Sequence, residues 1–272
     1  MFFRLTAMIL ALLMLAGCTR GLPAGRKNQE DEIKPGVTIQ PDEQTDRQAD
    51  EQTVIPGSNY TAADSFGDFL EAKGQLVTLL SDALMNNPGT ELDSMALLSI
   101  VMVDLLLLPA STFGAGEEEA KFALALLGAQ DIVYTENGNQ YKVQYQNEEG
   151  SQYQVQGVYD VAADALKCTV LVDEKEAVVS EHHKTSFGYV GQIYVVNDDG
   201  SANVYQMALR GKDGMIGISE ATAAPASLTG GEAVDFPKAN KEWYAIEGDR
   251  FTGVTADGRE LSFIYVPSGD EL

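Results

Sequence analysis

The sequence predicts an α+β fold, in which N-terminal helices pack on a large curved antiparallel β-meander. A change in periodicity predicts this class. Apolar residues recur at spacings of three and four between residues 62 and 128, as they do in amphipathic helices. From residue 131 to residue 267 the period is two, and short polar turns join the runs with no helix-length segment between them. Such a sheet should be antiparallel and mostly sequential, and at about ten strands it must curl into a half-barrel-like form.

The first 18 residues have the pattern of a short secretory signal. Arg4 supplies a positive charge, Leu5 to Leu13 is almost entirely apolar, and small residues precede Cys18. The stretch Leu15-Ala16-Gly17-Cys18 resembles the lipobox of bacterial lipoproteins. The resemblance implies that residues 1–17 are a signal peptide, that the Cys18 thiol receives diacylglycerol with acyl chains such as palmitate, and that this lipid anchors the chain in a cell membrane on its extracytoplasmic face. The alternatives are an ordinary cleaved signal and an uncleaved transmembrane helix, for which the apolar run is short of the roughly 20 residues needed.

Residues 18–59 are predicted to be the lipidated cysteine followed by a disordered tether. The segment is rich in Gln, Glu, Asp, Thr and Pro and has no aromatic residue, so it buries too little apolar surface to fold. Roughly 40 flexible residues have a root-mean-square reach of about 35 Å. We therefore expect a single α+β domain over residues 60–272, held clear of the membrane.

Two of the three expected helices have clear ends. The first should begin near Ala62 and end at Asn86-Asn87-Pro88-Gly89. The third should begin at Glu117-Glu118-Glu119, where negative charge suits the helix macrodipole, and Gly128 is its expected C-cap.

The second expected helix is the most apolar run after the signal. It covers Met95 to Pro109 with Thr90 as its expected N-cap, and Ser99 and Asp104 are its only polar side chains. The run is either a second membrane segment or a helix buried on nearly all sides, and its length and the charge of Asp104 favour burial. Such a helix fills the core or lines a ligand groove. We expect a filled core, with Leu106 as the residue that tests the choice.

The strands are predicted from alternating apolar residues bounded by turns such as Asn197-Asp198-Asp199-Gly200. A long loop rich in Ala, Gly, Pro, Ser and Thr, Glu220 to about Lys241, separates the last strands from the others, and such loops are either functional or irregularly packed. The expected strands cover residues 132–134, 141–145, 153–161, 166–172, 177–187, 189–196, 202–209, 215–218, 243–247, 250–254 and 261–266.

Tyrosines recur through these strands and could line a groove for an apolar ligand. The candidate ligand-binding residues are Tyr141, Tyr145 and Tyr194 in the sheet and Leu106 in the second helix. Strand propensity alone also explains the tyrosines, and it is the simpler explanation.

No catalytic residue, metal ligand or cofactor is predicted, and the chain is not expected to be an enzyme. Cys168 alternates with Leu166 and Val170 on one strand face, which indicates a small buried hydrophobe rather than a nucleophile. His182 and His183 are neighbours in a strand, so they point to opposite faces and cannot readily share a metal.

Charge limits the partners. The chain has 18 Lys and Arg residues against 41 Asp and Glu residues, for a net charge of −23. Such a surface repels a phosphate backbone, which excludes nucleic acid as a partner, and it disfavours electrostatic docking on anionic lipid.

The expected build resembles the open half-barrel of lipoprotein carriers of the LolA and LppX type, although those chains interleave helices with strands. The sequence therefore predicts a membrane-tethered extracytoplasmic lipoprotein that acts as a binding or interaction module for an apolar ligand or an envelope protein. The alternative is a lipid-anchored envelope hydrolase without a recognisable motif. The oligomeric state is left open.

Overall fold

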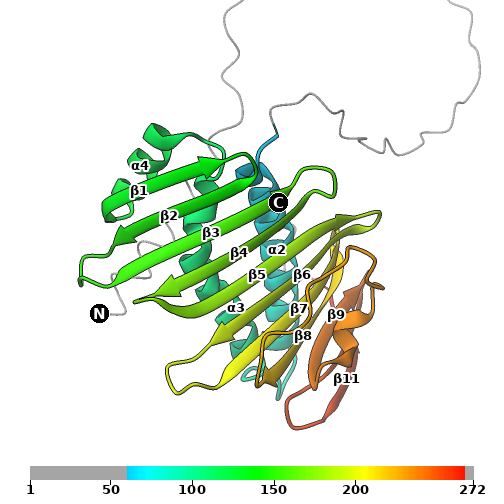
Figure 1. Ribbon diagram of the computed structural model, residues 1–272. Coiled ribbons are helices and arrows are strands. Elements are labelled where there is room, and N and C mark those ends of the chain that lie inside the picture. The colour runs from blue at the N-terminus through cyan, green and yellow to red at the C-terminus, as the bar shows by residue number, and fades with distance from the viewer. Residues whose placement is uncertain (1–59, 267–272) are drawn as a thin grey trace, which may run out of the picture. The chain divides into compact units, whose positions relative to one another are not determined.

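A computed structural model of the chain describes residues 60–266 (Figure 1). The signal peptide, Cys18 and the tether predicted for residues 1–59 lie outside the described residues. Three helices come first: α2 (Ala62–Met85), α3 (Ser94–Leu107) and α4 (Glu117–Leu126), with the 3-10 turn η1 (Leu108–Thr112) between the last two.

All the described strands form one antiparallel sheet of 11 strands, in the order β1 to β11 without a crossover. This confirms the expected sequential antiparallel sheet, although β5 and β11 end two residues before the predicted positions. The sheet is not closed, so β1 and β11 are its two edges. The strands are β1 (Gln130–Asn137), β2 (Gln140–Gln146), β3 (Gln152–Asp160), β4 (Ala165–Val172), β5 (Lys175–Thr185), β6 (Gly188–Val196), β7 (Ala202–Arg210), β8 (Asp213–Ala221), β9 (Glu242–Glu247), β10 (Arg250–Val254) and β11 (Glu260–Ile264).

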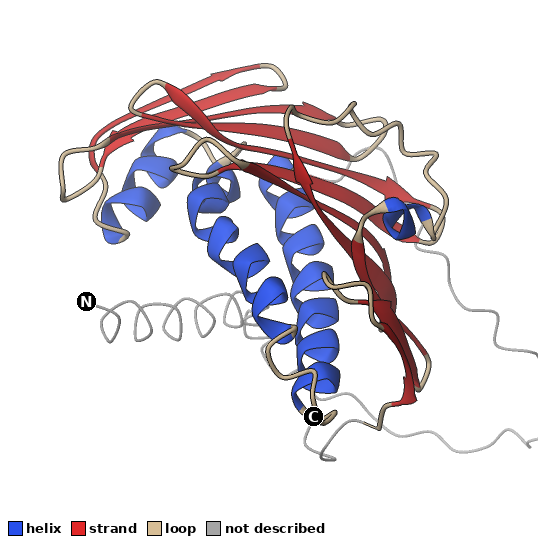
Figure 2. Cartoon of the chain, turned by 90° about the horizontal axis from the view of Figure 1, so that it is seen from below, coloured by secondary structure: helices blue, strands red, loops and turns tan. Residues whose placement is uncertain are grey.

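The helices lie together on one side of the sheet, and the sheet bends over them (Figure 2). Helix α2 packs against β4, β7, β8 and β9, and α4 packs against β1. One cluster of buried side chains fills the space between the layers, from Ala62 in α2 to Tyr265 after β11. Burying an aliphatic or aromatic side chain of this kind contributes roughly 1.5–3 kcal/mol, so this cluster is the main stabilising feature of the fold.

Local sequence sets the ends of α2 and α4. Thr61 and Asp64 form a capping box, in which the Asp64 N–H donates to Thr61 Oγ1 at 3.2 Å and the Thr61 N–H donates to Asp64 Oδ2 at 2.7 Å. Helix α4 ends at Leu126 with Leu127 as its C-cap, one residue before the predicted Gly128. Gly128 follows the cap with a φ of 85°, which suits glycine. The N–H groups of Gly128 and Ala129 donate to the carbonyls of Ala125 and Leu124, which is a Schellman motif.

Two expectations about α3 are wrong. Thr90 does not cap it, because the Thr90 hydroxyl donates to the Leu84 carbonyl at 2.7 Å and closes the end of α2. Nor is α3 buried on nearly all sides. It packs on α2, η1 and β4, and these neighbours bury only one face of it. That face carries Leu97, Ile100, Val103 and Leu107.

The loop between β8 and β9 lies against the convex face of the sheet, the face away from the helices. The Leu228 N–H donates to Glu181 Oε2 at 3.2 Å, and the Gln192 side-chain amide donates to the Ala226 carbonyl at 3.0 Å. The 3-10 turn η2 (Phe236–Ala239) packs on β7, β8 and β9. A side chain at Gly217 would meet the Pro237 carbonyl at 2.2 Å, so glycine is needed there for the close approach. The loop is thus ordered packing over the sheet.

Candidate binding surface

The outer side of α3 is apolar and open to solvent. Met95 is 63% exposed, Leu98 53% and Met102 41%. Their spacings of three and four residues place them on one side of the helix, which we call the outer stripe. Figure 2 shows no described helix or strand on the side of α3 away from the sheet. A helix at the surface of a globular protein normally carries polar side chains there, so the outer stripe is the unusual feature of this domain.

Further apolar side chains are exposed on the neighbouring helical segments. Met85 ends α2, Leu92 lies in the turn before α3, and Phe122 and Leu126 are one turn apart on α4. Large exposed apolar patches on protein domains usually mark sites of interaction with another molecule. Within residues 60–266, the span Ser94–Thr112 is also long and apolar enough to cross a membrane by length and composition, with a mean hydropathy of 2.0 and 39% of its window buried.

A buried ion pair fixes α3 on α2 and so sets which face of α3 is outermost. The Lys73 ammonium donates to Asp104 Oδ1, and it also lies 5.5 Å from the centroid of the Phe69 ring. The Lys73 side chain is 2% exposed and that of Asp104 is 20% exposed. Burial lowers the pKa of Lys73 and raises the pKa of Asp104, while each charge acts on the other in the opposite direction. Ser99 adds a second polar tie, with its hydroxyl 2.9 Å from that of Tyr205 in β7.

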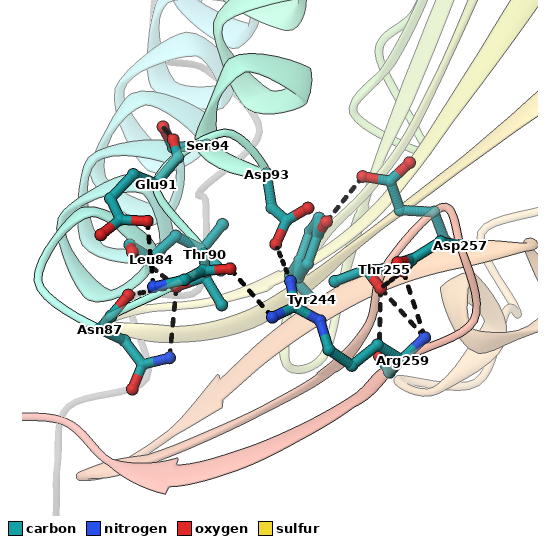
Figure 3. Close-up of polar contacts among 12 residues, drawn as sticks. Leu84, Asn87, Thr90, Glu91, Asp93, Ser94, Tyr244, Thr255, Asp257 and Arg259 are labelled. Atoms are coloured by element: carbon teal, nitrogen blue, oxygen red, sulfur yellow. Dashed lines mark hydrogen bonds and ion pairs between the residues drawn. The ribbon is translucent and has the colours of Figure 1, made fainter.

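The turn that leads into α3 is held by the far edge of the sheet. Arg259, the residue before β11, reaches this turn, where its guanidinium donates to the Gly89 carbonyl at 2.9 Å and to Asp93 Oδ2 at 2.7 Å (Figure 3). Thr255 supports the position of Arg259, because its hydroxyl oxygen accepts the Arg259 N–H at 3.1 Å (Figure 3). The start of α3 is therefore anchored by an ion pair as well as by packing.

Acidic side chains lie near both ends of α3. Glu91 precedes the helix and is exposed. At the other end η1 leads to the start of α4, where Glu117, Glu118 and Glu119 are all exposed. The nearby cation Lys121 is paired with Glu117 at 2.6 Å. On α3 itself Asp104 is the sole charged residue, and it is used in the pair with Lys73.

The four predicted ligand-binding residues do not come together. Tyr141 is buried on the concave face and stacks on Phe113 with ring centroids 5.0 Å apart. Tyr145 stacks on Tyr153 at 5.1 Å, and Leu106 is half-buried against the core. Tyr194 lies on the other face of the sheet, in a small cluster with Ala202 and Val204.

One serine–histidine contact escaped the sequence prediction, because 117 residues separate its members. Ser65 Oγ and His182 Nε2 are 3.0 Å apart, and the His182 ring stacks on Phe69 at 4.4 Å. Both polar residues are buried, and burial lowers the pKa of His182 to about 3, so the ring is neutral near pH 7. A substrate could not reach this pair, and its role is to join α2 to β5.

The other reactive side chains behave as the strand pattern predicts. Cys168 is buried in the core, and burial raises the pKa of its thiol to about 12, which leaves it protonated and unreactive near neutral pH. His182 and His183 do lie on opposite faces of β5, since His182 meets α2 while His183 Nε2 lies 3.2 Å from Glu181 Oε1 on the convex side. Among residues 60–266, no group of three or more His, Cys, Asp or Glu side chains could hold a metal ion.

A shallow hollow of about 240 Å³ lies over β9 and β10 on the convex side. Charged and polar side chains make up most of its lining, and the Lys238 ammonium within it lies 5.1 Å from the centroid of the Trp243 ring. The hollow has the wrong chemistry for an apolar ligand. Its lining residues are Lys238, Ala245, Glu247, Arg250 and Thr252.

Comparison of the chain with protein-family models, with curated proteins and with solved structures found no match in any of the three.

Proposed function

We propose that this chain is a lipid-anchored extracytoplasmic protein whose domain is an interaction module, and that the outer side of its helices is the binding surface. The observation that carries the proposal is the exposure of Met95, Leu98 and Met102 on a helix whose opposite face fills the core. Each Å² of apolar surface that is moved from water into an interface stabilises the complex by roughly 25 cal/mol, and these side chains leave that free energy unused in the unbound domain. A bound partner would recover that free energy.

The lipobox at Leu15 to Cys18 supports the membrane tether. Acyl chains on Cys18 would hold the domain at the membrane. The domain could then meet proteins of the same membrane without diffusing in three dimensions, which raises their effective concentration.

The shape of the surface favours a protein partner over a small apolar ligand. Small ligands are bound in concave sites that cover most of their surface. The outer stripe lies on the convex surface of a helix, and the hollow at β9 and β10 is charged and polar. The hydrolase alternative gains no support from Ser65 and His182, because both are buried.

The proposal can be tested by photo-crosslinking in the cells that make the protein. A photoreactive amino acid replaces Leu98 on the outer stripe or, as a matched control, Val158, which is an exposed apolar residue of β3. We expect Leu98 to give a discrete adduct with a second protein in the membrane fraction and Val158 to give none. Equal labelling from both positions, or none from either, would refute the binding surface.

A further inference from the structure

We propose that the partner of α3 is a basic amphipathic helix of another protein. This inference rests on the proposed function, and it names the chemistry of the partner. It follows from three properties of the surface: its dimensions, its methionines and its charges.

Helix α3, which carries the outer stripe, is long enough for a second helix to lie alongside it. Helix α3 has 14 residues, and at a rise of 1.5 Å per residue it is about 21 Å long. The outer stripe runs from Met95 to Met102, about two turns, so a partner helix packed on it needs apolar residues at spacings of three and four over that length. The ion pair of Lys73 with Asp104 and the contact of Arg259 with Asp93 hold α3 in place, so the face is preformed.

Methionine supplies much of the exposed apolar surface. Met95 and Met102 lie on the outer stripe, and Met85 is exposed at the end of α2. Methionine side chains are flexible and polarisable, so they adapt to partner side chains of different shapes. Such a surface is suited to a helix recognised by its apolar face rather than by one particular residue.

The charges around the stripe select a basic partner. Glu91 lies near one end of α3 and Glu117, Glu118 and Glu119 near the other, while α3 between them exposes no unpaired charge. A helix with Lys or Arg at both ends, about 20 Å apart, would place opposite charges together at each end. The whole chain adds long-range attraction for a cation, because its net charge is −23.

The same charges argue against two other occupants. A second copy of this chain would bring acidic ends against acidic ends if the helices lay parallel or antiparallel. An anionic bilayer would repel the four glutamates as the stripe approached it, because such surfaces attract Lys and Arg. A basic helix satisfies both the apolar stripe and its acidic ends.

The test uses the mature full chain in phosphatidylcholine nanodiscs, with empty nanodiscs as the blank. The probe is a fluorescent 18-residue peptide of leucine and lysine in an amphipathic pattern, and a leucine and glutamate peptide of the same pattern is its control. We expect the lysine peptide to bind at least tenfold more tightly than the glutamate peptide. The triple variant M95S/L98S/M102S should weaken binding at least tenfold, and V158S/V161S, which changes exposed apolar residues elsewhere, should leave it unchanged.

A charge variant separates attraction from apolar contact. E117Q/E118Q/E119Q should weaken binding of the lysine peptide severalfold and make its affinity less dependent on salt concentration. The reason is that salt screens the attraction between these exposed carboxylates and the lysines of the peptide. The far-ultraviolet circular dichroism of every variant should match that of the original chain, because only exposed side chains change. Equal affinity for the two peptides, or full binding by M95S/L98S/M102S, would overturn the inference.

The remaining outcomes distinguish this inference from the proposed function. An in-cell adduct at Leu98 without binding of the lysine peptide would reject the basic helix and retain the interaction surface. Binding to phosphatidylglycerol vesicles that M95S/L98S/M102S abolishes would replace the partner with a lipid surface. A dimer in analytical ultracentrifugation that the same variant dissociates would replace it with a second copy of this chain.

Discussion

The buried ion pair between α2 and α3 gives the sharpest stability prediction. Lys73 is almost wholly buried, and among the described residues its ammonium donates a hydrogen bond to Asp104 alone. The variant Asp104→Leu therefore leaves a buried ammonium without its acceptor. The ammonium can then lose its proton. At pH 7 the free energy of deprotonation is about 1.36 kcal/mol for each of the roughly 3.5 pH units below the ordinary lysine pKa of 10.5. Deprotonation therefore limits the loss of unfolding free energy in Asp104→Leu to about 5 kcal/mol. Breaking a buried ion pair usually costs about 3–5 kcal/mol.

The reverse variant, Lys73→Met, should cost less. The Asp104 side chain is 20% exposed, so water can solvate part of the carboxylate once the ammonium is gone. We expect a loss of about 1–2 kcal/mol. The double variant K73M/D104L removes both charges and should recover most of the stability, because an apolar replacement of a buried pair is often neutral or stabilising.

Urea unfolding at pH 7, followed by circular dichroism, measures these differences. The control is Lys121→Met, which breaks an exposed pair with Glu117 and should leave the midpoint of urea unfolding nearly unchanged, because solvent screens this pair. Equal losses for Asp104→Leu and Lys73→Met, or a double variant whose loss is the sum of the two, would refute the assignment of the pair as a buried, coupled contact.

Three further predictions follow from burial and from the lipobox. The pKa of His182 is lowered to about 3 in the folded state, so the unfolded chain binds more protons below pH 6.5, and stability should fall as the pH is lowered, by up to about 1.4 kcal/mol per pH unit near pH 5. His182→Phe should remove this contribution in unfolding curves between pH 6.5 and 5, and an unchanged slope in the variant would reject His182 as its origin. Leu107→Ala should cost about 2–5 kcal/mol in urea unfolding because Leu107 is fully buried, and half-buried Leu106→Ala should cost clearly less; the opposite order would contradict the orientation of α3. Cys18→Ser should move the protein out of the membrane fraction or block its processing, and a processed Cys18→Ser chain that stays with the membrane would show that the lipid is not the anchor.

The sequence pattern predicted the sheet well because strand signals are local. Alternation of period two and glycine-containing turns mark each strand on its own, and neighbours in sequence became neighbours in the sheet. Gly128 likewise ended α4, since a left-handed residue after a helix depends on that residue alone.

The candidate site was harder to predict because both faces of α3 are apolar. Leu97 is buried and Leu98 is exposed, yet the two are the same residue type in a nearly continuous apolar run. One contact that distinguishes the faces is the pair of Asp104 with Lys73, which lies 31 residues away on α2. Tyr194 shows the same limit in the sheet, because alternation groups residues by face without saying which face is covered.

The order of elements along the chain has a consequence for folding. Synthesis runs from the N-terminus, so α2 and α3 exist before the strands that will cover their inner faces. As each later strand is made, it pairs with the strand before it in the sequence. Most contacts are therefore between residues close in sequence, and the sheet can form strand by strand over helices that are already synthesised. The contact of Arg259 with Asp93 spans 166 residues, and together with the hydrogen bond from Tyr265 to Asp82 it closes the structure only when the last strand has arrived. We therefore expect folding to end where β11 meets the turn before α3, beside the surface proposed to bind the partner.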